Sequence, residues 1–413
     1  MTIRYRISRL GAQGDGIADT GKGQIFIPFT LPGEVVTASA GQGRAELISV
    51  LEPAPERVAP PCRHFGTCGG CALQHVDTQT YLDWKRSKVV DALASRGIEA
   101  DVAPIRACPP QSRRRLTFAA RKVEAGMLLG FNQAHSHQIV DIAECPIAVP
   151  EIVSALDHIR DIATLLCSTT KPFRVTVTAT ASGLDLAFED AGKLGDAARR
   201  KVTDHAVAMD IARLSLDGEI LVEPRKPVVM FGDIAVAPPP GGFLQAVAAA
   251  EDEMAGIVAG HVGKAKRIAD LFAGSGAFAL RLARGSEVHA VEGDAAALAA
   301  LDRGFRFAAG LRKVTTERRD LFRRPLLWKE LDAFDAVAFD PPRAGAEDQA
   351  RQIARSSVPK VAAVSCNPVT LARDLRILID GGYVLKTVVP VDQFLWSAHV
   401  EAVALLEKPR RRR

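Results

Sequence analysis

The chain has 413 residues, of which 47% are hydrophobic and 24% are charged, and its net charge is +5. This length predicts two or three domains with cores of their own, and this composition is typical of a soluble globular protein. The mild positive charge permits an anionic partner without requiring one. No apolar run is long enough to span a bilayer and the first residues form no signal peptide. We therefore expect a cytoplasmic protein whose seven cysteines are reduced rather than paired.

Residues 1–55 alternate short apolar stretches with glycine and proline, as at 25–28 and 31–36. Short strands at this rhythm predict a small β-barrel of the OB type. Barrels of this size often bind RNA, although the fold alone does not establish that function. The proline-rich residues 52–61 predict a linker to the next domain.

Three cysteines then follow in a C-x5-C-x2-C pattern, at Cys62, Cys68 and Cys71, in a loop rich in glycine. Thiols this close together indicate a metal site, and a four-thiolate site needs one more ligand. We choose Cys145 for that place, with Cys108 and Cys167 as rivals. Four thiolates suit either zinc or an iron–sulfur cluster, and the spacing alone does not decide between them.

The region 56–235 is predicted to be a central α+β domain that carries this loop. A helical pattern at 78–97 ends at Gly97, and this helix is a candidate to pack on the domain that follows. Residues 128–131, 138–142, 174–179 and 184–188 predict antiparallel strands, with one helix near 151–166. The basic stretch 112–122 suits contact with RNA phosphates and suits a solvated charged edge equally well.

From residue 236 onward, strands alternate with helices, which is typical of a parallel sheet. Gly274 and Gly276 follow the strand at 268–271, and two glycines there let the backbone approach a cofactor at a helix N-terminus. The next strand ends in Glu292, a position where an acid suits hydrogen bonds to ribose hydroxyls. Dehydrogenases use a similar glycine turn, so this pattern alone leaves a nicotinamide-dependent oxidoreductase open.

Three further strand ends carry reactive side chains. Asp340 opens a rigid Asp-Pro-Pro turn after the strand at 334–339. Cys366 ends an apolar strand just before a helix, where the helix N-terminus is expected to lower the thiol pKa and favour a nucleophile over an inert buried cysteine. Glu401 begins the last strand of a hairpin-like pair at 384–391 and 401–406, which makes it a candidate general base or a surface carboxylate.

Together these motifs resemble the family of RNA uracil-C5 methyltransferases that use S-adenosylmethionine, in its iron–sulfur branch acting on 23S ribosomal RNA. The resemblance covers nearly the whole chain. It is carried by Asp-Leu-Phe-Ala-Gly-Ser-Gly at 270–276, Asp-Pro-Pro-Arg at 340–343, Ser-Cys-Asn-Pro-x-Thr at 365–370 and the cysteine pattern. It implies a TRAM-like β-barrel at 1–55 and a Rossmann-like class I methyltransferase domain at 236–413.

The resemblance also implies roles for single residues. Cys366 matches the nucleophile and Glu401 the general base. The methyl-donor contacts match Gln245, Phe272, Gly274, Gly276, Glu292, Asp340 and, more weakly, Asp320. A 4Fe-4S cluster, with zinc as the alternative, would be held by Cys62, Cys68, Cys71 and Cys145. The chain departs from the family where Ala277 and Val247 replace asparagines and in the alanine-rich residues 295–300.

The implied reaction begins when the Cys366 thiolate adds to C6 of uracil, which makes C5 nucleophilic enough to take the methyl group. Glu401 then removes the C5 proton. The target base must leave its stack, which costs least in single-stranded RNA loops. We expect a monomer acting on ribosomal RNA. The alternatives are the T-loop uridine of tRNA and a non-catalytic RNA-binding chaperone, which the intact Cys366, Asp340 and Glu401 disfavour. The tail 410–413 is expected to be a solvated terminus.

Overall fold

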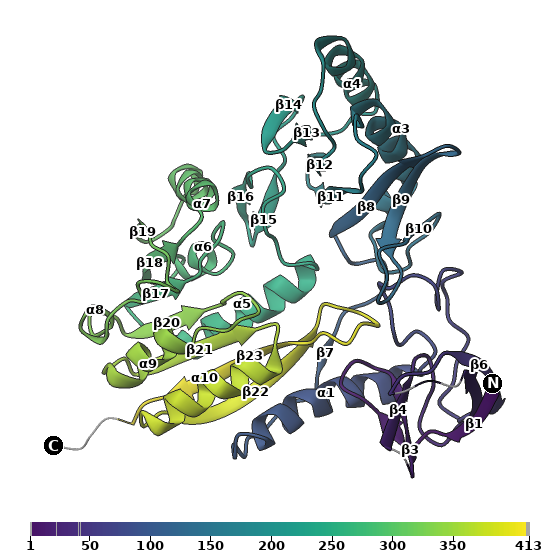
Figure 1. Cartoon of the computed structure of the whole chain (residues 1–413). Coiled ribbons are helices and arrows are strands. Elements are labelled where there is room, and N and C mark those ends of the chain that lie inside the picture. The colour runs from purple at the N-terminus through teal and green to yellow at the C-terminus, as the bar shows by residue number, and fades with distance from the viewer. Residues whose placement is uncertain (1, 22, 40, 42, 410–413) are drawn as a thin grey trace.

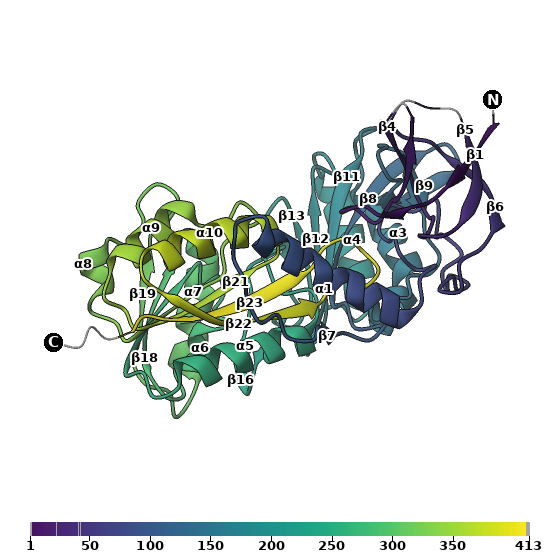
Figure 2. The same cartoon turned by 90° about the horizontal axis from the view of Figure 1, so that it is seen from below.

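The computed structural model describes residues 2–21, 23–39, 41 and 43–409, so the tail at 410–413 lies outside the described residues. Figure 1 shows three parts: a pair of small N-terminal sheets, a central sheet with helices at its far end, and a C-terminal sheet between helices. In the view from below, α1 lies along the C-terminal sheet and reaches back toward the N-terminal strands (Figure 2). No helix among these residues has the length and apolarity needed to cross a membrane.

The N-terminal part consists of two three-stranded antiparallel sheets. Their buried residues, Tyr5 and Val36 in one sheet and Ala18 and Ile27 in the other, share one core. The sequence predicted a small barrel; the structure has two packed sheets, and strand pairing among the described residues does not join them into one ring. The strands are β1 (Thr2–Arg6), β5 (Val35–Ser39) and β6 (Leu47–Glu52), then β2 (Arg9–Leu10), β3 (Gly16–Thr20) and β4 (Gly23–Ile27).

Helix α1 (Thr78–Ala94) connects the N-terminal part to the C-terminal one. The Asp77 side chain caps it by accepting hydrogen bonds from the first-turn amides. Val89 and Leu93 are buried in the same core as the C-terminal helices. Each such side chain contributes about 1.5–3 kcal/mol when fully buried, which fixes α1 on the sheet. The chain then adds a short strand, β7 (Arg106–Ala107), to the edge of that sheet.

The central part is a seven-stranded sheet packed against helices. The sequence indicated a single helix near 151–166, whereas the structure has two in succession and a third at 196–208. The polar pattern of the third helix hides a narrow buried face formed by Val202 and Ala206, which is why the sequence gives little sign of it. In spatial order the strands are β10 (Ile139–Asp141), β9 (Gly126–Asn132), β8 (Arg115–Val123), β11 (Phe173–Thr180), β12 (Gly183–Glu189), β13 (Arg213–Leu216) and β14 (Glu219–Val222). The helices are α2 (Pro150–Ser154), α3 (Leu156–Leu166) and α4 (Asp196–Ala208).

The C-terminal part is an eight-stranded sheet in the order β19-β18-β17-β20-β21-β23-β22-β7. The first five of these strands are parallel, and β23 runs antiparallel to both of its neighbours, as the predicted parallel sheet and terminal strand pair require. The strands are β17 (Arg267–Leu271), β18 (Glu287–Glu292), β19 (Val314–Arg318), β20 (Ala336–Phe339), β21 (Lys360–Ser365), β22 (Val384–Asp392) and β23 (Glu401–Glu407).

Helices cover both faces of this sheet because alternate residues of its strands enter two separate cores. One face carries α5 (Ala248–Val262), α6 (Ala279–Leu282) and α7 (Ala295–Phe307), together with the hairpin β15 (Val229–Phe231) and β16 (Ile234–Val236). The other face carries α1, α8 (Trp328–Leu331), α9 (Glu347–Arg355) and α10 (Pro368–Asp380).

This topology gathers several chain segments at one edge of the sheet. The parallel strands β17, β18, β20 and β21 all end there, and the antiparallel β23 begins there. The carboxyl edge of a parallel sheet is where ligands bind in open α/β folds.

Candidate active site

The carboxyl edge of the C-terminal sheet opens into a cavity of about 550 Å³. All but one of the residues predicted to contact a donor or to react line this cavity. They are Gln245, Phe272, Gly274, Glu292, Asp320, Asp340, Cys366 and Glu401. Gly276 lies in the same turn without lining the cavity. Residues from several strand ends therefore meet at one place.

The glycine turn after β17 depends on unusual backbone conformations. Gly274 and Gly276 have φ angles of 54° and 100°. A Cβ on Gly276 would stand 2.8 Å from Cγ of Leu301, so a larger residue does not fit there. Glu292 braces the turn, because its Oε2 accepts a hydrogen bond from the Gly274 amide at 2.9 Å. The helix predicted after the turn is only α6, which begins at Ala279, so the turn meets no long helix N-terminus.

Aromatic rings form the apolar walls of the cavity. The rings of Phe272 and Phe322 lie 5.4 Å apart, centroid to centroid, at 55° to each other. Phe322 is 48% exposed, and Phe243 is 71% exposed where it lines the same cavity. The sequence motifs do not single out Phe322 or Phe243. Flat apolar surfaces of this kind are suited to stacking against purine or pyrimidine rings.

A chain of buried amides connects the two acids of the site. Nε2 of Gln393 donates to Oε1 of Glu401 at 2.8 Å and to Oε1 of Gln245 at 2.6 Å. Nε2 of Gln245 in turn donates to Oδ2 of Asp340 at 2.8 Å. Oε1 of Gln393 accepts from the amide of Ala246 at 2.9 Å, so this side chain is held at both ends. The sequence did not predict a role for Gln393. The only local sign of one is that Gln393 is a polar residue directly after an apolar strand.

Both acids have pKa values raised into the neutral range, so protonated and ionised forms of each coexist near neutral pH. Burial raises the pKa of Glu401 to about 8, the nearby Asp340 adds to the rise, and the hydrogen bond from Gln393 opposes it. Burial likewise raises the pKa of Asp340 to about 7, against the hydrogen bond from Gln245. Oε2 of Glu401 is buried and has no hydrogen-bond partner among the described residues. Glu401 is only 3% exposed, so it is not the surface carboxylate of the alternative interpretation.

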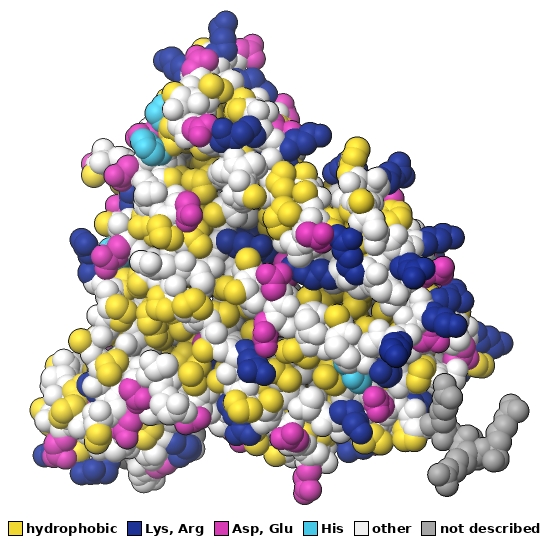
Figure 3. Space-filling view, turned by 180° about the vertical axis from the view of Figure 1, so that it is seen from behind, with side chains coloured by type: hydrophobic (Ala, Val, Ile, Leu, Met, Phe, Trp, Pro, Cys, Tyr) yellow, Lys and Arg dark blue, Asp and Glu magenta, His cyan; other side chains and the backbone are white. Residues whose placement is uncertain are grey.

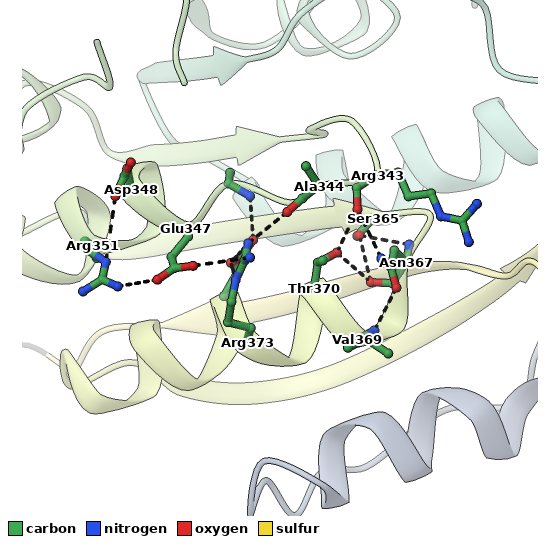
Figure 4. Close-up of polar contacts among 12 residues, drawn as sticks. Arg343, Ala344, Glu347, Asp348, Arg351, Ser365, Asn367, Val369, Thr370 and Arg373 are labelled. Atoms are coloured by element: carbon green, nitrogen blue, oxygen red, sulfur yellow. Dashed lines mark hydrogen bonds and ion pairs between the residues drawn. The ribbon is translucent and has the colours of Figure 1, made fainter. Parts of the chain in front are cut away.

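Cys366 stands between β21 and α10, as predicted. The prediction that the helix N-terminus lowers the thiol pKa is wrong for the ligand-free protein. Burial, Glu401 and Asp340 raise the thiol pKa to about 11, while Arg343 opposes them. Figure 4 shows the turn that holds this position. The Asn367 side chain accepts from the Val369 amide at 3.1 Å and donates to the Arg343 carbonyl at 3.2 Å. The effect of the helix N-terminus is thus outweighed by burial and by two carboxyls that other strands supply.

Two arginines of the basic stretch 112–122, Arg114 and Arg115, are bonded within the protein. Nη2 of Arg114 donates to Oε2 of Glu251 at 2.9 Å, and its Nε donates to the Gln245 carbonyl at 3.2 Å. Nε of Arg115 donates to the Gly242 carbonyl at 3.1 Å. These two side chains fasten the central sheet to the segment that carries Gln245. The expectation of a phosphate-contacting edge therefore fails for them, because their N–H groups are used in hydrogen bonds to backbone carbonyls and to the buried Glu251.

The four cysteines chosen as metal ligands lie around a separate cavity of about 340 Å³, which is lined by Cys62, Cys68, Cys71 and Cys145. Neither rival lines it, since Cys108 is buried in the core of the C-terminal sheet and Sγ of Cys167 donates to the Thr169 carbonyl at 3.1 Å. Burial raises the pKa of the Cys71 thiol to about 12. Within the described residues, no three His, Cys, Asp or Glu side chains are arranged to hold a single metal ion.

The cysteine loop is tied to the segment that precedes Glu401. The amides of Ala72 and Leu73 donate to the Trp396 carbonyl at 2.8 and 3.1 Å. The Tyr81 hydroxyl accepts from the Trp396 amide at 2.7 Å and donates to Oδ2 of Asp392 at 2.6 Å. The segment 393–400 is therefore held from the cysteine side and from α1.

The departures from the family pattern differ in where they lie. Val247 is buried in the hydrophobic core and does not line the active cavity. Ala277 and Ala297 do line it, so small apolar side chains occupy two positions of the cavity wall.

Known proteins resemble this chain in sequence and in fold, and the matched residues include those of the candidate active site. A family model described as tRNA (Uracil-5-)-methyltransferase matches residues 305–409. An uncharacterized RNA methyltransferase of Mesorhizobium japonicum is 64% identical over 413 residues, covering 100% of both chains. The 23S rRNA (uracil(1939)-C(5))-methyltransferase RlmD of Halomonas elongata is 32% identical over 437 residues, covering 98% of this chain and 89% of that one. The structure of the Pyrococcus abyssi tRNA (uracil-54, C5)-methyltransferase in complex with S-adenosyl-L-homocysteine matches with a TM-score of 0.78 and 24% identity, covering 98% of this chain and 99% of that one.

Proposed function

The chain belongs to the family of S-adenosylmethionine-dependent RNA uracil-C5 methyltransferases, and we propose that it methylates one uridine of 23S ribosomal RNA through a covalent Cys366 adduct. The observation that carries the proposal is the pairing of β21 with β23. Ser365 is opposite Ala402 in this antiparallel pair, so the register sets Cys366 beside Glu401 at the cavity edge. A nucleophile and a base so placed can act on adjacent carbons of one ring.

The proposed reaction accounts for each proton that moves and each bond that forms or breaks. Cys366 loses its thiol proton to solvent, and its Sγ bonds to C6 of uracil, which moves electron density to C5. C5 then takes the methyl group that S-adenosylmethionine supplies when bound. Glu401 accepts the C5 proton on its unpartnered Oε2, the C5–C6 double bond re-forms and the bond between Sγ and C6 breaks. The freed thiolate is ready for another cycle.

The residues present fit the methyl donor. Phe272 and Phe322 provide an apolar wall for the adenine, and a cavity of about 550 Å³ is in the range that binds molecules of this size. Each Glu292 oxygen already accepts one backbone amide and has capacity left for ribose hydroxyls. In their ionised forms, Asp340 and Glu401 favour a cation in the cavity that both line. A cationic sulfonium there would offset the carboxyls that raise the Cys366 pKa and so favour the thiolate.

We also propose that Cys62, Cys68, Cys71 and Cys145 hold an iron–sulfur cluster, of the 4Fe-4S type. The four thiols line one cavity, and four thiolates are the ligand set of such a cluster, with zinc as the alternative. Such a cluster would cross-link the loop at 62–71 to the central sheet beside Cys145. Methyl transfer from a sulfonium needs no electron, so the cluster's proposed role is structural.

Two observations bear on the RNA substrate. Identity of 32% along almost the whole length of a 23S ribosomal RNA enzyme supports ribosomal RNA. The matching family model is described for tRNA, and the Pyrococcus abyssi protein of similar fold is a tRNA methyltransferase, which keeps the T-loop uridine as the second candidate. We further propose a three-domain division at 1–55, 56–235 and 236–413 for a cytoplasmic monomer.

The test is to incubate the purified protein with labelled S-adenosylmethionine and unmodified 23S ribosomal RNA or tRNA transcripts, and to map the methylated base. We expect 5-methyluridine at one position of the ribosomal RNA, and no product or RNA–protein adduct with Cys366→Ala. Product in tRNA alone would replace the substrate and keep the mechanism. Turnover by Cys366→Ala would refute the covalent mechanism.

A further inference from the structure

A second cavity, of about 390 Å³, adjoins the active cavity and shares Cys366 and Arg343 with it. We name it the flanking cavity. Its other walls come from distant parts of the chain: residues 10–13 at the end of β2 and in the turn that follows it, Trp84 and Lys88 of α1, and His399. Since Cys366 belongs to both cavities, a molecule bonded to its sulfur has a neighbouring space on the side away from the donor.

Two cations of the flanking cavity have no anionic partner among the described residues. Lys88 places its Nζ 4.7 Å from the centroid of the Trp84 ring and donates to the Ala12 carbonyl. Within that part of the chain, neither Lys88 nor Arg343 forms an ion pair, and Asp91 is the only carboxylate in the lining. The backbone carbonyl of Arg343 accepts the hydrogen bonds of the turn drawn in Figure 4, and the Arg343 guanidinium extends away from that turn.

The environment of these side chains is strongly positive. Burial, Lys85 and Arg343 lower the pKa of Lys88 to about 8. Burial also lowers the pKa of His399, and the nearby charges that add to this effect are all cations: Arg343, Lys88, Lys85 and Arg113. Lys85 differs from Lys88 because its charge is neutralised by the buried carboxylate of Asp392. A cavity with unneutralised cations favours an anionic ligand.

We propose that the flanking cavity receives the nucleotide joined to the target uridine, with its phosphodiester held between Lys88 and Arg343. The proposal rests on the proposed function, because it places the target base at Cys366. A volume of about 390 Å³ is enough for one nucleotide, and Trp84 contributes an aromatic side chain, the residue type against which unstacked bases pack. The N-terminal sheets thereby take part in substrate binding through residues 10–13.

The salt dependence of RNA binding tests this assignment. Affinities of the full-length protein for unmodified 23S ribosomal RNA and tRNA transcripts are measured across a series of salt concentrations for wild type, Lys88→Gln and Arg343→Gln. Each lost phosphate contact lowers the slope of log K against log salt by about one. Lys329→Gln is the matched control, since Lys329 also lies over a tryptophan ring, 5.4 Å from Trp328, but outside both cavities.

We expect the slope to fall by about one for Lys88→Gln and for Arg343→Gln, and to stay unchanged for Lys329→Gln. Binding of S-adenosylhomocysteine by Lys88→Gln should match wild type, which shows that the fold is intact. Unchanged slopes in both cavity variants, or a wild-type protein that binds neither RNA, overturn the proposal. A wild type that binds RNA with the expected slopes but transfers no methyl group would refute the proposed function and leave the phosphate site standing.

Discussion

Replacing Gln393 by leucine tests the link between the buried amide chain and the general base. The change removes the hydrogen bonds of Gln393 to Glu401, Gln245 and the Ala246 amide while nearly keeping the side-chain volume. A hydrogen bond to a charged group contributes about 1.5–3 kcal/mol, and 1.36 kcal/mol corresponds to a tenfold change in ionisation. The ionised fraction of Glu401 at neutral pH should therefore fall by about 10- to 100-fold.

The sign follows from the direction of the pKa shift. The pKa of Glu401 is already raised to about 8, and Gln393 is the neighbour that lowers it. Its loss raises this pKa further, so removal of the C5 proton by Glu401 slows at neutral pH and recovers as the pH rises. The assay is release of tritium from RNA labelled at C5 of uracil, followed from pH 6.5 to 9.5 under single-turnover conditions.

Gln349→Leu provides the matched control. Gln349 is also buried, and its amide bonds to both the amide and the carbonyl of Leu326, away from the active cavity. The Gln349→Leu change should lower the stability of the protein by a similar amount without moving the pH profile of tritium release. A Gln393→Leu profile that superimposes on the wild-type profile would falsify the positioning role, even if the overall rate were lower.

Three more predictions concern the acids and the cysteines. Glu401→Gln should trap the methylated covalent adduct on a denaturing gel, whereas turnover at the wild-type rate would remove Glu401 as the base. Asp340 has a pKa of about 7 in the ligand-free protein, so binding of a sulfonium at pH 7 should release protons, measured by calorimetry in buffers of different ionisation enthalpy. Asp340→Asn should reduce this release to the part that Glu401 contributes, S-adenosylhomocysteine should release less, and heats that are independent of buffer would contradict the reasoning. Cys145→Ser should contain less iron and melt at a lower temperature than wild type, whereas Cys167→Ser should match wild type in iron content and melting temperature. Equal iron content in the two variants would reject Cys145 as a ligand.

Surface charge agrees with an RNA-binding protein without identifying the binding face. On the face shown in Figure 3, Lys and Arg side chains gather over the side of the molecule nearest the C-terminus. Many basic side chains of the described residues are paired with acids, such as Arg319 with Glu330 at 2.8 Å. Substrate contact is therefore better assigned to Lys88 and Arg343, which form no ion pair among the described residues, than to the overall charge.

The reactive residues could be found in the sequence because each is marked by local structure. Asp340 and Cys366 follow apolar runs and precede prolines, and such runs predict strands that end at the ligand edge of a parallel sheet. The cysteine triplet at 62–71 is also a local pattern. These features depend on hydrophobic period and turn chemistry, which neighbouring residues determine.

Tertiary structure decided what depends on distant residues. It brought Cys145 to the other three thiols and left Cys108 and Cys167 elsewhere. It raised the Cys366 pKa, because the two nearby carboxyls arrive from other strands. It also set Gln393 between Glu401 and Gln245, and turned Arg114 and Arg115 inward. Burial and the charge of neighbours through space control ionisation and hydrogen bonding, and only the packed sheet determines which residues become neighbours.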